Sequence, residues 1–172
     1  MKISVDTMDA AHKACAEGDK KETEAFMDQF MKKQPDLCVF LDTLSQEFKD
    51  EDAAELVFFM ALVLARSFDM AGIKIGLIKA DDVENAWNRN EQLAKTVAGD
   101  ERAISDMASE EDHLTNYPEP VLLSVILSGI MEPDGAEKNV FEKEDDQSLA
   151  FLILKTFLDV LIGASESAGS EQ

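Results

Sequence analysis

Two acidic clusters are the first residues in this sequence whose types and spacing could do chemistry. Glu51, Asp52 and Glu55 stand close together, and Asp81 and Glu84 follow after a connection. Acids that are three or four residues apart lie on one face of a helix. Carboxylates arranged in this way can hold Mg²⁺ jointly, with substrate phosphates completing its coordination. If both clusters are helical, these five carboxylates form a candidate magnesium site.

The spacing resembles that of the all-α nucleotide pyrophosphohydrolases related to the MazG family. Their pattern is two acids, two spacers and an acid, then an acid pair on a second helix. Here it corresponds to Glu51-Asp52-Ala53-Ala54-Glu55 and Asp81-Asp82-Val83-Glu84, with the second pair in the order Asp-x-x-Glu where the family has Glu-x-x-Asp. This resemblance implies an alternative function, the Mg²⁺-dependent hydrolysis of nucleotides.

The same acids also fit a purely structural role. Glu51 and Asp52 fall in the expected first turn of a helix, where negative charge stabilises the helix dipole. No cluster of basic residues that could bind substrate phosphates stands nearby. We favour this structural interpretation, which predicts a protein without catalytic residues or a cofactor and leaves Mg²⁺ to the alternative.

A second candidate metal site involves the two histidines. Asp106, Glu110 and His113 share one expected helix face, and Asp9-Ala-Ala-His12 forms a second acid-x-x-His pair. Di-iron helical bundles use two such Glu-x-x-His pairs with two further carboxylates. In this sequence the first acid-x-x-His pair comes before any helix with a single carboxylate, and it uses Asp in place of Glu, so the di-iron pattern is not matched. We therefore expect His12 to be a core residue, and we expect Asp106, Glu110 and His113 to form a solvated helix face.

The only tryptophan lies on an unusual helix. Trp87 is expected on the buried side, and Asn90 at the edge of the same stripe, although Asn is a poor helix former. A buried amide needs hydrogen-bond partners, so we expect Asn90 to be satisfied by the backbone. The alternative is a polar groove beside Trp87 that binds a peptide or small ligand.

The elements that must position these residues are helices, because apolar residues recur at helical spacing between Gly and Pro punctuation. The fourth and eighth are apolar on nearly every side, which is typical of central helices. The sequence predicts an all-α, single-domain bundle of seven or eight helices, at about 7–17, 20–33, 35–48, 50–70, 81–97, 100–114, 118–131 and 145–164.

Two helix pairs in this bundle show a weak internal likeness. Pro35 and Pro120 each begin a helix, and acidic residues 51–52 and 144–145 precede the two most apolar ones. A duplicated helical hairpin explains this likeness. So does common capping chemistry, since prolines and acids are favoured in any first turn.

The charge of −20 is unevenly distributed, because residues 80–172 carry twenty-one acidic and six basic groups. Such a field repels nucleic acid and anionic membranes and attracts basic protein surfaces. We therefore predict a protein-interaction or adaptor module. It recognises a basic partner through the acidic surface of residues 80–145, or associates with itself through an apolar face of the last helix.

The cysteines and the two ends of the sequence give expectations about the cellular compartment and the extent of the domain. Cys15 and Cys38 have no CxxC spacing and are expected to be buried in a reducing compartment. Since residues 1–9 contain no apolar stretch of a signal peptide, we expect a cytoplasmic protein. Residues 1–164 should form the domain, and residues 165–172 a disordered polar tail.

Overall fold

The computed structural model describes residues 2–97, 116–131, 140–141 and 143–170. These residues form seven helices and no strands, packed as a single bundle, as predicted. The helices are α1 (Val5–Glu17), α2 (Lys20–Lys33), α3 (Pro35–Ser45), α4 (Glu51–Met70), α5 (Ala80–Val97), α8 (Pro120–Met131) and α9 (Glu144–Ser170). The helix expected at 100–114 lies outside the described residues.

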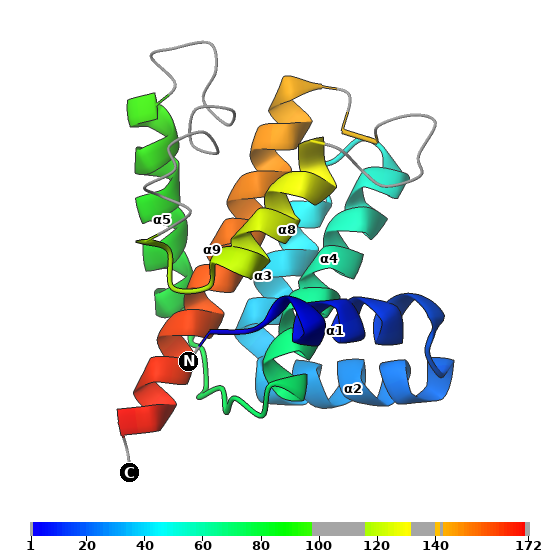
Figure 1. Cartoon of the computed structure of the whole chain (residues 1–172). Helices are drawn as coiled ribbons and strands as arrows, with labels where there is room; N and C mark the ends of the chain where they lie inside the picture. Colours follow the sequence, from blue (N-terminus) through cyan, green and yellow to red (C-terminus); the bar gives the residue numbers. More distant parts are fainter. Residues whose placement is uncertain (1, 98–115, 132–139, 142, 171–172) are drawn as a thin grey trace.

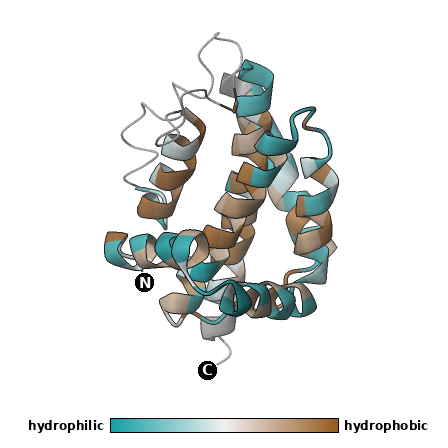
Figure 2. Cartoon of the chain, turned by 90° about the vertical axis from the view of Figure 1, so that its right-hand side faces the viewer, coloured by the Kyte–Doolittle hydropathy of each residue, from teal (hydrophilic) through white to brown (hydrophobic). Residues whose placement is uncertain are grey.

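Helix α9 runs through the middle of the bundle and contacts α3, α4, α5 and α8 (Figure 1). Helices α1 and α2 form a separate layer, in which α1 packs across α4. Figure 2 shows apolar residues, in brown, along the middle helices, whereas polar residues, in teal, prevail at the periphery. The two helices expected at the centre, α4 and α9, are therefore in contact with each other inside the bundle.

Short side chains and glycines determine where several of these helices begin and end. Ser4, Asp19 and Asp50 are N-caps that accept backbone N–H groups of α1, α2 and α4. Gly72, with a φ of +71°, follows the end of α4, a conformation that glycine adopts without strain. Helix α9 extends to Ser170, so the end predicted at Ala164 is six residues too early. The small residues after Gly163 are compatible with a helix.

Helix α9 is also long and apolar enough to cross a membrane by composition alone. The segment Glu144–Glu166 has a mean hydropathy of 1.7 in its most apolar window, and 56% of that window is buried in the bundle. Central helices of bundles share this length and composition, because they are covered on all sides. In this structure other helices supply that cover.

Both predicted helix pairs are present, since α3 precedes α4 and α8 precedes α9. The two pairs pack differently. Helix α9 packs against its pair partner α8 and against α5, whereas α4 packs mainly against α1 and less against its pair partner α3. Duplication of a hairpin stays a prediction.

Gln34 holds the connection between α4 and α5 with its side-chain amide. Its Nε2 donates to the Gly76 carbonyl at 2.9 Å, and its Oε1 accepts the Ile78 N–H at 2.9 Å. Gln34 is itself buried. The amide thus acts like a short piece of backbone and fixes the point where α5 begins.

A second long-range hydrogen bond ties the N-terminal segment to α8. The Ile3 N–H donates to the Glu119 carboxylate at 2.7 Å, and both residues are buried. Burial raises the pKa of Glu119, while the Ile3 hydrogen bond and the charge of Lys2 partly oppose this rise. The protonated carboxyl group is therefore easier to bury at this position than the carboxylate.

The first prediction concerns the packing of α9. Leu154→Ala, at a fully buried position, should lower the free energy of unfolding by about 2–5 kcal/mol, because it leaves a cavity. Leu77→Ala, at a position that is 64% exposed, is the matched control and should change it by less than about 0.5 kcal/mol. Urea titration followed by circular dichroism measures both. Equal losses in the two variants would contradict the central place of α9.

The second prediction concerns pH. Since the folded pKa of Glu119 is raised, the folded chain binds this proton more tightly than the unfolded chain does. The stability contribution is thus complete at low pH and is lost as pH rises through the folded pKa. Wild type should lose stability relative to Glu119→Gln as pH rises from about 4, the usual pKa of a glutamate side chain, through the raised folded pKa. Urea titrations of both proteins at several pH values measure this. If the difference in their free energies of unfolding does not change with pH, the prediction is wrong.

Candidate functional site

The five acids of the candidate magnesium site are not gathered by the fold. Glu51, Asp52 and Glu55 are exposed on the first turns of α4, where Asp50 accepts the Asp52 N–H at 2.9 Å. The start of α4 lies at the upper right of Figure 1, whereas α5 begins at its lower end on the left. Glu51 and Asp52 therefore occupy the first turn of the helix, as the structural interpretation predicted.

The two acids on α5 are also exposed. Asp81 and Glu84 lie in its first turns, and Glu84 lines a groove described below. Among the described residues, no group of three or more His, Cys, Asp or Glu side chains could hold a metal ion. At the start of α5, Asp36 accepts the Ala80 N–H at 3.0 Å, and Asp82 accepts the Lys79 N–H at 2.9 Å.

Only part of the candidate metal site with the two histidines lies within the described residues. Asp106, Glu110 and His113 lie outside the described residues. His12 is exposed and makes an edge-to-face contact with Phe59 at 5.5 Å, so its prediction as a core residue is wrong. The stripe of α1 that packs on α4 passes beside His12 and buries Ala11 instead.

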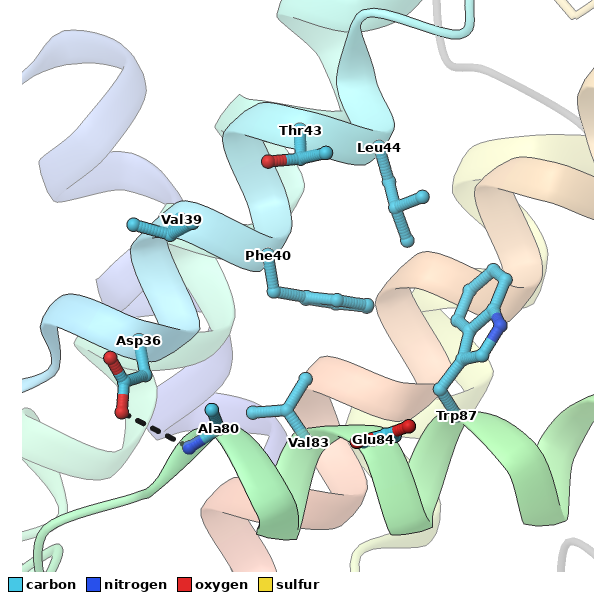
Figure 3. Close-up of a pocket in the computed structure, with 9 residues that line it drawn as sticks. All are labelled: Asp36, Val39, Phe40, Thr43, Leu44, Ala80, Val83, Glu84 and Trp87. Atoms are coloured by element: carbon cyan, nitrogen blue, oxygen red, sulfur yellow. Dashed lines mark hydrogen bonds between the residues drawn. The ribbon is translucent and has the colours of Figure 1, made fainter.

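A groove with apolar walls lies between α3 and α5, beside the only tryptophan. Figure 3 shows Phe40 and Leu44 pointing from α3 toward Val83 and Trp87 on α5. The rings of Phe40 and Trp87 meet edge to face, with centroids 5.8 Å apart. The groove has a volume of about 340 Å³. We call it the α3–α5 groove, and its lining comprises Asp36, Val39, Phe40, Thr43, Leu44, Ala80, Val83, Glu84 and Trp87.

The groove is held open by contacts that lie at its ends. The hydrogen bond between Asp36 and the Ala80 N–H joins the starts of α3 and α5 (Figure 3). The Phe40–Trp87 contact joins them again, about one turn further along α3 and about two turns further along α5. Between these points Val39 is 63% exposed, although it is β-branched and apolar. The groove therefore combines fixed walls with an apolar surface that the described residues leave uncovered.

The charge around this groove is negative. Among the residues that the structure describes, its lining includes two carboxylates, Asp36 and Glu84, and no basic residue. Over their whole lengths α3 and α5 carry six acidic and two basic residues. Glu91 lies one helical turn beyond Trp87, and Glu47 follows the end of α3. An apolar surface bordered by carboxylates is complementary to an amphipathic segment with lysine or arginine beside its apolar residues.

Asn90 belongs to a polar cluster behind the groove. As predicted it is buried, but its partners are side chains of α9 and not the backbone. Its Nδ2 donates to Thr156 Oγ1 and to Asp159 Oδ2, both at 3.0 Å, and its Oδ1 accepts from Lys155 Nζ at 2.9 Å. These bonds attach α5 to the central helix.

The two charged side chains of this cluster, Lys155 and Asp159, form an ion pair. Lys155 Nζ lies 2.8 Å from Asp159 Oδ2, and the two side chains are only 14% and 20% exposed. The Tyr117 hydroxyl donates to Asp159, and the Lys155 ammonium lies 5.4 Å from the centre of the Tyr117 ring. Burial, together with the neighbouring Asp159 carboxylate, raises the pKa of Tyr117 far above its usual value, so the phenol remains a donor.

Comparison with known proteins does not add to these observations. No protein-family model, no curated protein and no solved structure matches this chain.

The third prediction tests the polar cluster. Asp159→Ala should lower the free energy of unfolding by about 3–5 kcal/mol, because it leaves the Lys155 ammonium buried without its counter-ion. Replacing both partners, as in Lys155→Met with Asp159→Leu, should recover most of this loss. The control is the more exposed pair Arg66–Asp69, where Asp69→Ala should cost at most about 1 kcal/mol. Equal costs for the two single variants would show that the α9 pair is not desolvated.

Proposed function

We propose that this protein is a non-catalytic interaction module that binds a basic amphipathic segment of a partner protein in the α3–α5 groove. The observation that carries the proposal is an apolar groove beside Trp87 whose charged lining residues, within the described part of the chain, are all acidic. Binding there would bury apolar side chains in the groove and place basic side chains beside Asp36 and Glu84. This function needs neither a metal nor a cofactor.

The dimensions of the groove favour a short helix. Its α3 wall extends from Asp36 to Leu44, which corresponds to about 12 Å of helix. A bound helix of two turns has the same length and presents residues i, i+3 or i+4, and i+7 on one face. Trp87 is the expected anchor on the protein side, because aromatic residues dominate the binding energy of many interfaces.

Self-association through the last helix is a weaker alternative. Between Leu149 and Ile162 the apolar side chains of α9 are buried or half-buried by other helices. The α3–α5 groove offers apolar surface without any rearrangement. The acidic surface expected over residues 80–145 falls partly outside the described residues, and the proposal relies only on acids within them.

The fourth prediction tests binding directly. A synthetic helix with leucines at i, i+4 and i+7 and lysines elsewhere should bind and change the emission of Trp87, the only tryptophan. Calorimetry should show Trp87→Ala weakening this binding about 30-fold, as expected when an interface loses about 2 kcal/mol. Glu84→Gln should weaken it about threefold, because one rim charge contributes less than about 1 kcal/mol.

Three controls make this experiment decisive. Glu22→Gln, on α2 and outside the groove, should bind as wild type does. Raising the salt concentration from about 0.1 M to 0.5 M should weaken binding to wild type, because it screens charges at the rim. A peptide with glutamates in place of its lysines should not bind. Equal affinity for both peptides, or no effect of Trp87→Ala, would overturn the proposal.

A further inference from the structure

The opposite side of α3 borders a second apolar groove, which lies between α2, α3 and α4. Its volume is about 220 Å³, and none of the described residues that line it is basic. We call it the methionine groove, and its lining comprises Met27, Phe30, Met31, Cys38, Leu41, Asp42, Phe58, Ala61, Leu62, Ala65 and Phe157. It shares no lining residue with the α3–α5 groove.

Large apolar side chains at this groove are unusually exposed. Met27 is 40% exposed, Met31 is 47% exposed and Phe58 is 38% exposed. Burial raises the pKa of the Cys38 thiol, which therefore stays protonated at neutral pH and acts as a small apolar wall. Methionine side chains are unbranched and flexible, so they adapt to apolar partners of different shapes.

One end of the methionine groove is acidic. Glu51, Glu55, Phe58 and Leu62 follow heptad spacing along α4, so they lie on one face of that helix. Phe58 and Leu62 line the groove, and the two exposed glutamates continue this face toward the helix start. Asp42 adds a third carboxylate from α3. Two acids of the candidate magnesium site thus border an apolar surface.

We propose that the methionine groove is a second docking site, whose occupant is a basic amphipathic helix of a partner protein. Its apolar side chains would lie against Met27, Met31 and Phe58, and its lysines or arginines would lie beside Glu51, Glu55 and Asp42. Helix α3 then separates two occupied grooves, and the protein is an adaptor that holds two segments at once. The adaptor role rests on the proposed function, whereas the second docking site does not.

The two sites can be observed separately in one sample. The leucine–lysine helix described above is the probe, Trp87 emission reports on the α3–α5 groove, and ¹³C-methyl signals of Met27 and Met31 report on the methionine groove. Leu substitutions at Met27 and Met31 assign the two signals. The expected result is two peptides per chain by calorimetry, with both reporters responding. Analytical ultracentrifugation without peptide should show a monomer.

Two substitutions at exposed positions test the residues that carry the inference. Phe58→Lys and Met31→Lys should each weaken the second binding event at least tenfold, because they add positive charge to a site for a basic helix. Neither should alter the change in Trp87 emission. Circular dichroism and the unfolding midpoint check that both variants fold, and Val5→Lys, at another exposed apolar position, is the matched control.

Each outcome separates this inference from the proposed function. One peptide per chain with only Trp87 responding overturns the second site and leaves the proposed function standing. A response of the methionines alone supports the second site and contradicts the proposed function. A dimer that the peptide dissociates, with Met27 and Met31 at its contact, would make a second copy of this chain the occupant and overturn the proposal. No response from either reporter rejects both sites.

Discussion

Helix α9 is apolar on nearly every side, and the arrangement of the bundle follows from the need to cover it. Between Ala150 and Ile162 its residues are buried except for Leu152, Lys155 and Asp159, which are half-buried. Burying so much apolar surface is the dominant favourable term in folding, and it requires neighbours around the whole helix. Helices α3, α4, α5 and α8 supply them.

The one polar interruption of α9 determines how α5 is attached. Lys155 and Asp159 would be costly to bury alone, and Asn90 and Tyr117 complete their hydrogen bonds. Since apolar contacts are non-directional, this cluster supplies the orientation that they lack. Gln34 and Asp36 fix the other end of α5 through the Ile78 and Ala80 N–H groups. With both ends fixed, the outer edges of α3 and α5 remain apart and the α3–α5 groove remains open.

Helical spacing and capping residues predicted the helices. They could not predict hydrogen bonds between residues that are far apart in the sequence. Helical spacing and caps such as Asp50 place α4 within one residue of its observed start. The burial of Asn90 also follows from its position beside the Trp87 stripe. Its partners lie 65 to 69 residues away, and the contacts of Gln34 lie 42 and 44 residues away. No local pattern reports such distances, because they depend on how whole helices pack.

The acidic clusters illustrate the same limit at the candidate site. Spacing places Glu51 and Glu55 on one helix face, and this holds, but it does not say what lies beside that face. A metal site would need acids from α5 at the same place, and α5 begins at the other end of the bundle (Figure 1). What the packing brings beside these glutamates is Phe58 and the methionine groove. Metal chemistry and protein binding therefore make different demands on tertiary contacts, which local spacing does not report.

Net charge and exposed apolar surface are linked by a physical argument. Two grooves that expose Val39, Met31 and Phe58 would favour association between copies of this chain, because apolar surfaces of this kind promote it. A net charge of −20 opposes that association, since two copies repel each other before their grooves can meet. A basic amphipathic partner meets attraction where a second copy meets repulsion, and it covers the same apolar side chains. In the proposed function, the acidic composition therefore favours partners of opposite charge in the grooves over other copies of this chain.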